Sequence, residues 1–180
     1  MASRLSQIFK RERAEIKDAR VVYAALMAQS RRPEFYGEGA VPDSYDGRID
    51  FLTLHLAVVF AALKSHGDTG PKLSQAIYDV MIDDFDVALR EEGLSDTGVV
   101  RRIKPMANLF FERVKAYSEA LFGTKEKLSG TIQSGYKTDI TPGNLVRLTE
   151  YTLAFRETLG SKSLGEIARA DFVFPDYSPA

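Results

Sequence analysis

Apolar residues along the chain recur at the spacing of α-helices, with polar stretches between them. No sustained apolar–polar alternation indicates a strand. The pattern predicts helices over residues 4–30, 49–66, 71–92, 96–122 and 144–159. The connection over 123–143 has room for one more short helix. We therefore expect an all-α fold, a single compact domain (1–180) of about five to seven helices.

The second predicted helix and the segment before it stand out in this pattern. Residues 49–66 are apolar almost all round, so this helix should be buried at the centre of the fold. Residues 31–48 contain two Pro and three Gly and are typical of a long loop. Its Phe35, Tyr36 and Tyr45 either pin the loop to the core or form a binding edge, and pinning is favoured. Residues 170–180 are expected to form an irregular tail.

The distribution of charge separates the N-terminal helix from the rest of the chain. The net charge is −1 over 180 residues, but residues 1–32 carry eight basic and three acidic side chains. This basic amphipathic segment has a charge of +5, and the remainder has −6. It is either a solvated helix or a contact for an anionic surface such as lipid or ribosomal RNA. The contact residues would be Lys10, Arg11, Arg13 and Lys17. The acidic remainder argues against a nucleic-acid-binding module, so no DNA partner is expected.

Cysteine is absent, which excludes disulfides and thiolate metal sites. The longest apolar run, FLTLHLAVVFAAL at 51–63, is too short for the roughly 20 residues that span a bilayer. No signal peptide is visible. We expect a cytoplasmic protein.

The predicted helix over 71–92 has a narrow polar face, and Asp84 falls inside its apolar arc. The polar face is made of Gln75, Asp79, Asp83, Asp86 and Arg90. A carboxylate is costly in an apolar interface unless it is paired. We therefore expect Asp84 to be buried and to pair with Arg102, Arg113 or a backbone end. The alternative is a proton-transfer or substrate-binding role.

The candidate chemistry is otherwise sparse. The aspartates lie on one helix without a second set of ligands, so no metal is expected. Phosphate-binding glycine motifs are absent, and no cofactor is predicted. His55 lies in the most apolar helix and is favoured as a satisfied core residue over a catalytic base. The rival to a non-enzymatic function is a helical enzyme that uses Asp84 and His55 on an isoprenoid or quinone-type substrate.

The segment DVMIDDFDVALREEGLSDTGVVRRIKPMANLFFERVKAYSEAL, residues 79–121, resembles the signature block of the ubiquinol-cytochrome c chaperone family, the cytochrome bc1 assembly factors. The upstream PEFYGEGAVPDSYDGRIDFLTLHL resembles that family's loop and first core helix. The resemblance covers about residues 20–160. The matching residues are Asp83, Asp84, Asp86, Leu89, Arg90, Glu91, Gly93, Asp96, Phe111, Arg113, Ala116 and Tyr117.

The resemblance implies a non-enzymatic, bacterial-type assembly chaperone that binds newly made cytochrome b at the inner-membrane surface. Family relatives also work with a small partner subunit and contact the ribosome. A chaperone for a membrane protein should expose apolar surface of its own. Phe111, Tyr78 and Phe85 are the candidates to line such a groove; the alternative, that all three pack in the core, is slightly favoured. Asp79, Asp83, Asp86 and Arg90 would remain exposed for a partner.

Overall fold

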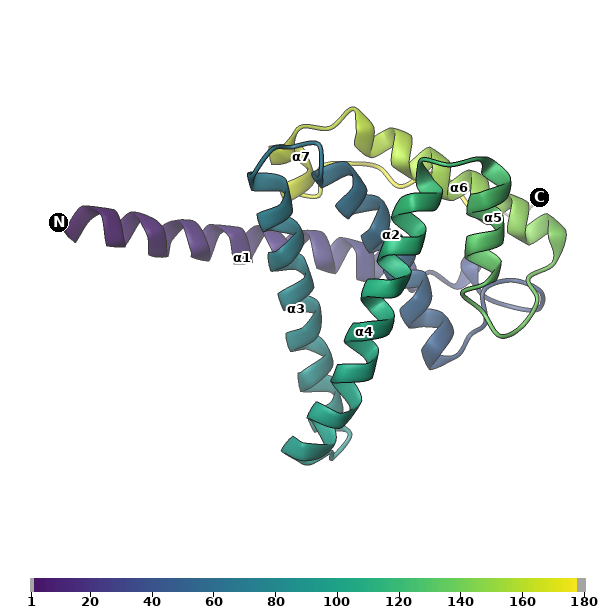
Figure 1. Cartoon of the computed structure of the whole chain (residues 1–180), viewed down its shortest axis with the longest axis horizontal. Helices are drawn as coiled ribbons and strands as arrows, with labels where there is room; N and C mark the ends of the chain where they lie inside the picture. The colour runs from purple at the N-terminus through teal and green to yellow at the C-terminus, as the bar shows by residue number, and fades with distance from the viewer. Residues whose placement is uncertain (1, 178–180) are drawn as a thin grey trace.

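The computed structural model describes the backbone of residues 2–177 and the side chains of residues 14–177. Within these residues the regular secondary structure is helical and contains no β-strand, which confirms the all-α prediction. The α-helices are α1 (Ala2–Ser30), α2 (Tyr45–Leu63), α3 (Thr69–Glu91), α4 (Asp96–Leu121), α5 (Lys125–Gln133), α6 (Pro142–Gly160) and α7 (Leu164–Ala168). Figure 1 shows them gathered into one domain, from which the N-terminal half of α1 projects.

Helix α2 is the centre of the domain, as its sequence predicts. Its neighbours are α1, α3, α4 and α6. From Asp50 to Val59 every residue of α2 is buried. Because the helix is covered on all sides, it needs apolar side chains around its whole circumference.

The helix ends follow from local sequence signals. Ser44 and Ser95 accept hydrogen bonds from the backbone N–H groups of Gly47 and Gly98, which caps α2 and α4. After α3, Gly93 adopts a φ of +87°. There the backbone N–H of Leu94 donates to Leu89 O and that of Gly93 donates to Arg90 O. This pair of bonds is a Schellman motif, which favours glycine at the left-handed position.

The loop after α1 is pinned mainly by two of its three aromatic residues. Phe35, in the short 3-10 helix Pro33–Phe35, is fully buried. The Tyr36 hydroxyl donates to the Ser30 carbonyl oxygen, while Tyr45 is exposed. Pinning is therefore confirmed for Phe35 and Tyr36 but not for Tyr45.

The C-terminal segment has no regular structure over residues 171–177, yet it packs against the core. Tyr177 is buried and stacks on Phe35 with ring centroids 4.4 Å apart. Phe174 lies 5.0 Å from Phe155 by the same measure. These contacts hold residues 171–177 against α6 and the loop after α1.

Candidate functional site

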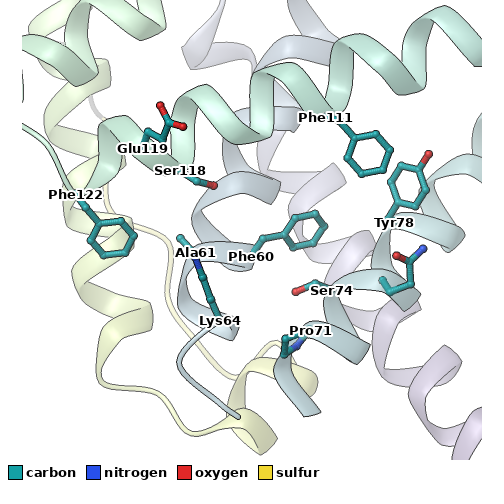
Figure 2. A pocket seen from close by; sticks show the side chains of 11 residues that line it. Phe60, Ala61, Lys64, Pro71, Ser74, Tyr78, Phe111, Ser118, Glu119 and Phe122 are labelled. Carbon is teal, nitrogen blue, oxygen red and sulfur yellow. The ribbon is translucent and has the colours of Figure 1, made fainter. Parts of the chain in front are cut away.

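An apolar groove opens between the end of α2, the start of α3 and the C-terminal half of α4 (Figure 2). Its volume is about 520 Å³. The lining residues are Phe60, Ala61, Lys64, Pro71, Ser74, Gln75, Tyr78, Phe111, Ser118, Glu119 and Phe122.

Helical spacing brings these residues to one surface. Pro71, Ser74, Gln75 and Tyr78 recur at three- and four-residue steps along α3, so their side chains share one face. On α4 the same rule aligns Phe111, Ser118 and Phe122 on the opposite wall. Phe60 comes from α2 and lies between the two walls in Figure 2.

Two large aromatic side chains of the groove are open to solvent. Phe111 is 53% exposed and Phe122, just after the end of α4, is 71% exposed. The Phe111 and Tyr78 rings lie 4.9 Å apart between centroids. Phe110 is buried behind them, 5.4 Å from the Tyr78 ring. Phe111 therefore lies outside the core, and its exposed ring is available for an apolar partner.

The structure brings together two of the three aromatic residues predicted for the groove. Tyr78 and Phe111 line it, but Phe85 lines a separate cavity beside α1. Phe85 is about two turns along α3 from Tyr78, so it faces a different set of neighbours. Sequence reasoning missed Phe60 and Phe122. The spacing of Phe111, Ser118 and Phe122 was an available signal for Phe122.

The acidic face of α3 is partly engaged in local contacts. Asp83 is exposed, and Asp79 accepts a hydrogen bond from the Gln75 side chain at 2.8 Å. Arg90 pairs with Asp86 at 2.5 Å and also with Asp96. Among the described residues, no three potential metal ligands of the His, Cys, Asp or Glu type gather into a site.

The predicted burial and ion pairing of Asp84 are wrong. Asp84 is exposed and accepts a hydrogen bond from the Tyr23 hydroxyl at 2.8 Å. Its arc of α3 is only partly covered at this level, because Val87 and Ala88 on the same arc are also exposed. Arg102 is exposed on α4. Helical periodicity placed Asp84 on the correct arc of α3, but it could not show at which level along α3 the neighbouring helices stop covering that arc.

Among the residues whose side chains are described, the buried carboxylate is Asp50, in α2. Its Oδ1 lies 3.1 Å from Arg113 Nε, and its Oδ2 accepts a hydrogen bond of 2.5 Å from the Tyr117 hydroxyl. Burial raises the pKa of Asp50 to about 6, although the bond from Tyr117 and the charge of Arg113 act in the opposite direction. Gly135 lies so close that an added Cβ would come within 2.4 Å of Asp50 Oδ2. Arg113 thus forms an ion pair with Asp50 and not with the predicted partner Asp84.

His55 is enclosed in the aromatic core. Its Nδ1 lies 2.9 Å from Phe51 O, and its Nε2 lies 2.8 Å from the Tyr151 hydroxyl. Complete burial lowers the pKa of His55 to about 4. Of the two cavities among the described residues, Asp84 lines one and His55 lines neither, and His55 is buried while Asp84 is exposed, so this arrangement does not favour the predicted rival enzyme.

The basic segment includes all of α1, whose N-terminal half projects from the domain (Figure 1). The first buried residue of the helix in the described range is Ala19, and Lys17 is exposed. The side chains of Lys10, Arg11 and Arg13 lie outside the described residues. In the part of the chain that is described, no helix is long and apolar enough to span a membrane.

The fold and the groove alone do not define a class of protein. Comparison with known proteins gives the class. The sequence model of the family described as "Ubiquinol-cytochrome C chaperone" matches residues 38–174. The chain is also similar to the Cbp3 homolog from Brucella abortus, known from a crystal structure, with a TM-score of 0.78 and 30% sequence identity. That similarity covers 96% of this chain and 97% of the Brucella chain. No curated protein matches the sequence.

The chain therefore belongs to the ubiquinol-cytochrome c chaperone family. Membership supports a role as an assembly chaperone for the cytochrome bc1 complex.

Proposed function

We propose that this chaperone binds newly made cytochrome b and that the groove lined by Phe111, Tyr78 and Phe122 holds an apolar segment of that client. The observation that carries the proposal is the exposure of Phe111 and Phe122 at a groove of about 520 Å³. A membrane protein that is not yet inserted or assembled exposes apolar side chains. Contact with an apolar groove removes those side chains from water and so opposes aggregation.

The composition of the groove supports a client of this kind. Its walls are aromatic and aliphatic, with Ser74, Gln75 and Ser118 as uncharged polar residues. The charged residues Lys64 and Glu119 are both exposed and carry opposite charges. The groove therefore has no strong preference for one sign of charge. This composition is compatible with a segment recognised by its apolar character, as expected for a transmembrane client.

We further propose that the projecting half of α1 holds the chaperone peripherally at an anionic surface, either the cytoplasmic face of the inner membrane or the ribosome. Residues 2–18 precede Ala19, the first buried residue among the described side chains of α1, and span about 25 Å at the rise of an α-helix. A basic helix that extends from the body can approach such a surface while the groove remains open. The acidic face of α3 with Arg90 is proposed as a surface for the client or a small partner subunit.

The proposed function is tested by replacing the groove residues in the native organism. A Phe111→Ala/Phe122→Ala variant should accumulate to the normal level but support less assembled bc1 complex and less cytochrome b. Val100→Ala is a matched control, because Val100 is 65% exposed on α4 and lines neither cavity. Normal cytochrome b and bc1 levels in the double variant would contradict the proposed groove function.

A further inference from the structure

A second cavity lies beside the C-terminal end of α1, enclosed by the following loop, the first turns of α2 and the later turns of α3. Its volume is about 410 Å³, and it shares no lining residue with the client groove. Its apolar side is formed by Met27, Ile49, Leu52 and Phe85. Leu52 is buried, and the other three are partly buried.

Two arginines line the polar side of this cavity. The Arg48 guanidinium lies 4.9 Å from the centre of the Tyr36 ring, and its Nε donates to Asp43 at 2.6 Å. Tyr36 is in turn fixed by its bond to the Ser30 carbonyl oxygen. These contacts restrain Arg48 while leaving its two terminal nitrogens without a hydrogen bond to any described residue. Arg31 has no carboxylate partner among the residues that the structure describes, although it lies close enough to Tyr23 and Tyr36 to influence the pKa of each.

The cavity also presents one acceptor. Asp84 lines it and receives the Tyr23 hydroxyl on Oδ2, which leaves Oδ1 free to accept a further hydrogen bond. The polar side therefore combines guanidinium donors with a carboxylate acceptor, next to an apolar surface. A carboxylate or a phosphate alone brings only acceptors and would be repelled by Asp84, so a ligand that matches both sides carries a hydrogen-bond donor beside its anionic group. A peptide segment has both, as an acidic group and a backbone N–H.

We propose that this cavity is a second docking site, which binds an acidic–apolar peptide segment of a protein partner. The peptide's carboxylate pairs with Arg31 and Arg48, its neighbouring large apolar side chain covers Leu52 and Phe85, and a backbone N–H donates to Asp84. Guanidinium groups bind carboxylates in bidentate geometry, which gives such a site orientation as well as affinity. The proposal is independent of the client groove, since the two cavities are separate.

The carboxylate could come from an Asp or Glu side chain or from a chain terminus, and a peptide array separates these sources. Acetylated hexapeptides with one Glu among apolar residues are compared with matched Gln peptides, each with a free or an amidated C-terminus. Dissociation constants are measured by fluorescence anisotropy on the full-length protein. Glu peptides should bind more tightly than Gln peptides, and Arg31→Glu should weaken them by roughly tenfold or more, as for the loss of a charge-assisted hydrogen bond.

Controls make the result specific to this cavity. Arg31 is exposed, so its replacement should leave the thermal unfolding curve unchanged, and Arg48→Gln provides a second test. Arg101→Glu, on the exposed surface of α4, should not affect the peptides. The proposal is overturned if Glu and Gln peptides bind equally, or if Arg31→Glu and Arg48→Gln bind the Glu peptides as tightly as the wild type does. It is also overturned if the two variants keep their affinity for the peptides but bind less to phosphatidylglycerol vesicles, because the arginines would then serve a lipid surface.

Discussion

Two buried ionisable residues have shifted pKa values in opposite directions. Asp50 is held by Arg113 and Tyr117, and burial raises its pKa from 3.8 to about 6. His55 is completely buried against Phe51 and Tyr151, and burial lowers its pKa from 6.5 to about 4. Both groups therefore change protonation on unfolding in the same range of pH.

The two shifts predict opposing effects on stability between about pH 4 and 6. Native Asp50 holds a proton that the unfolded chain releases, so its contribution to stability falls as pH rises. Unfolded His55 binds a proton that the native state excludes, so its contribution falls as pH drops. Asp50→Asn should therefore make the unfolding free energy decrease more steeply on acidification, and His55→Gln less steeply. Each difference from the wild type approaches at most about 1.4 kcal/mol per pH unit.

The measurement is urea unfolding of the wild type and the two variants at several pH values. Both variants should be less stable at every pH, because each substitution disturbs a buried contact. The diagnostic quantity is consequently the slope with pH. Parallel curves for the three proteins would show that Asp50 and His55 titrate alike in the folded and unfolded states.

At the scale of single residues, the sequence indicated which side chains are unusual better than it indicated what surrounds them. His55 was correctly expected in the core because its helix is apolar on every side. Asp84 was placed on an apolar arc, but whether an arc is covered depends on which other helices reach that level. Burial of Asp50 was not predicted, because Asp50 lies at the start of the apolar run, where a polar residue is typical of an exposed helix end. Its partners Arg113 and Tyr117 are distant in sequence.

The tight turn between α2 and α3 depends on one glycine. Gly70 is buried in the first turn of α3, and an added Cβ would lie 1.8 Å from the Leu63 carbonyl oxygen. Because the obstructing atom belongs to the backbone, the two helices would have to move apart. Gly70→Ala should lower the unfolding free energy by about 1–3 kcal/mol or more.

Gly130 offers a matched control for this prediction. It lies inside α5, and an added Cβ would meet nothing within 4 Å. Alanine should therefore stabilise the protein there, by up to about 1 kcal/mol. Equal changes in unfolding free energy for Gly70→Ala and Gly130→Ala in chemical denaturation would mean that the close approach of α2 and α3 does not require glycine at position 70.

The acidic face of α3 should serve recognition with little effect on folding. Asp79 and Asp83 are exposed, so an Asp79→Lys/Asp83→Lys variant should change stability by no more than about 0.5 kcal/mol per site. The same variant should lower the yield of cytochrome b that co-purifies with the chaperone. Glu157→Lys, exposed on α6, is the control. An undiminished yield would remove the acidic face from the binding surface.

Most helices could be predicted from the sequence, because apolar stripes, N-capping residues and glycines at helix C-termini are all local signals. Ser95 and Gly93 lie at the predicted ends of the fourth and third helices. The five-residue α7 was not predicted, since it is short and held by a capping box between Ser163 and Glu166. Packing of the C-terminal segment also escaped prediction, because Phe172, Phe174 and Tyr177 find their partners on α6 and in the loop after α1.

For the molecule as a whole, the projecting part of α1 predicts salt-dependent attachment to an anionic surface. Replacing Lys10, Arg11, Arg13 and Lys17 with Gln should weaken sedimentation with anionic vesicles or with ribosomes. The difference should be greatest at low salt, where charges are least screened. Four neutralised residues in the body, Arg101, Lys104, Lys115 and Lys127, serve as a control. Unchanged binding to vesicles and ribosomes would exclude α1 as the attachment.

The groove itself could be predicted only in part. Phe111 and Tyr78 were identifiable because each lies at the edge of its helix's apolar stripe. The way α3 and α4 pack against the end of α2 determines which edges of their apolar stripes face each other. The sequence of a single helix does not contain this information. Phe60 therefore could be assigned to the groove only from the folded chain, whereas the spacing of Phe122 from Phe111 and Ser118 was a signal in the sequence.

Site-specific photo-crosslinking from the groove is the most direct test of the central claim. A photoreactive amino acid at Gln75, which is exposed at the groove, is compared with the same group at Val100 during synthesis of cytochrome b. We predict a crosslink to cytochrome b from position 75 that is lost in Phe111→Ala/Phe122→Ala and is weak or absent from position 100. Equal crosslinking from both positions, or crosslinking from Gln75 that survives the double substitution, would contradict the assignment of the groove as the client site.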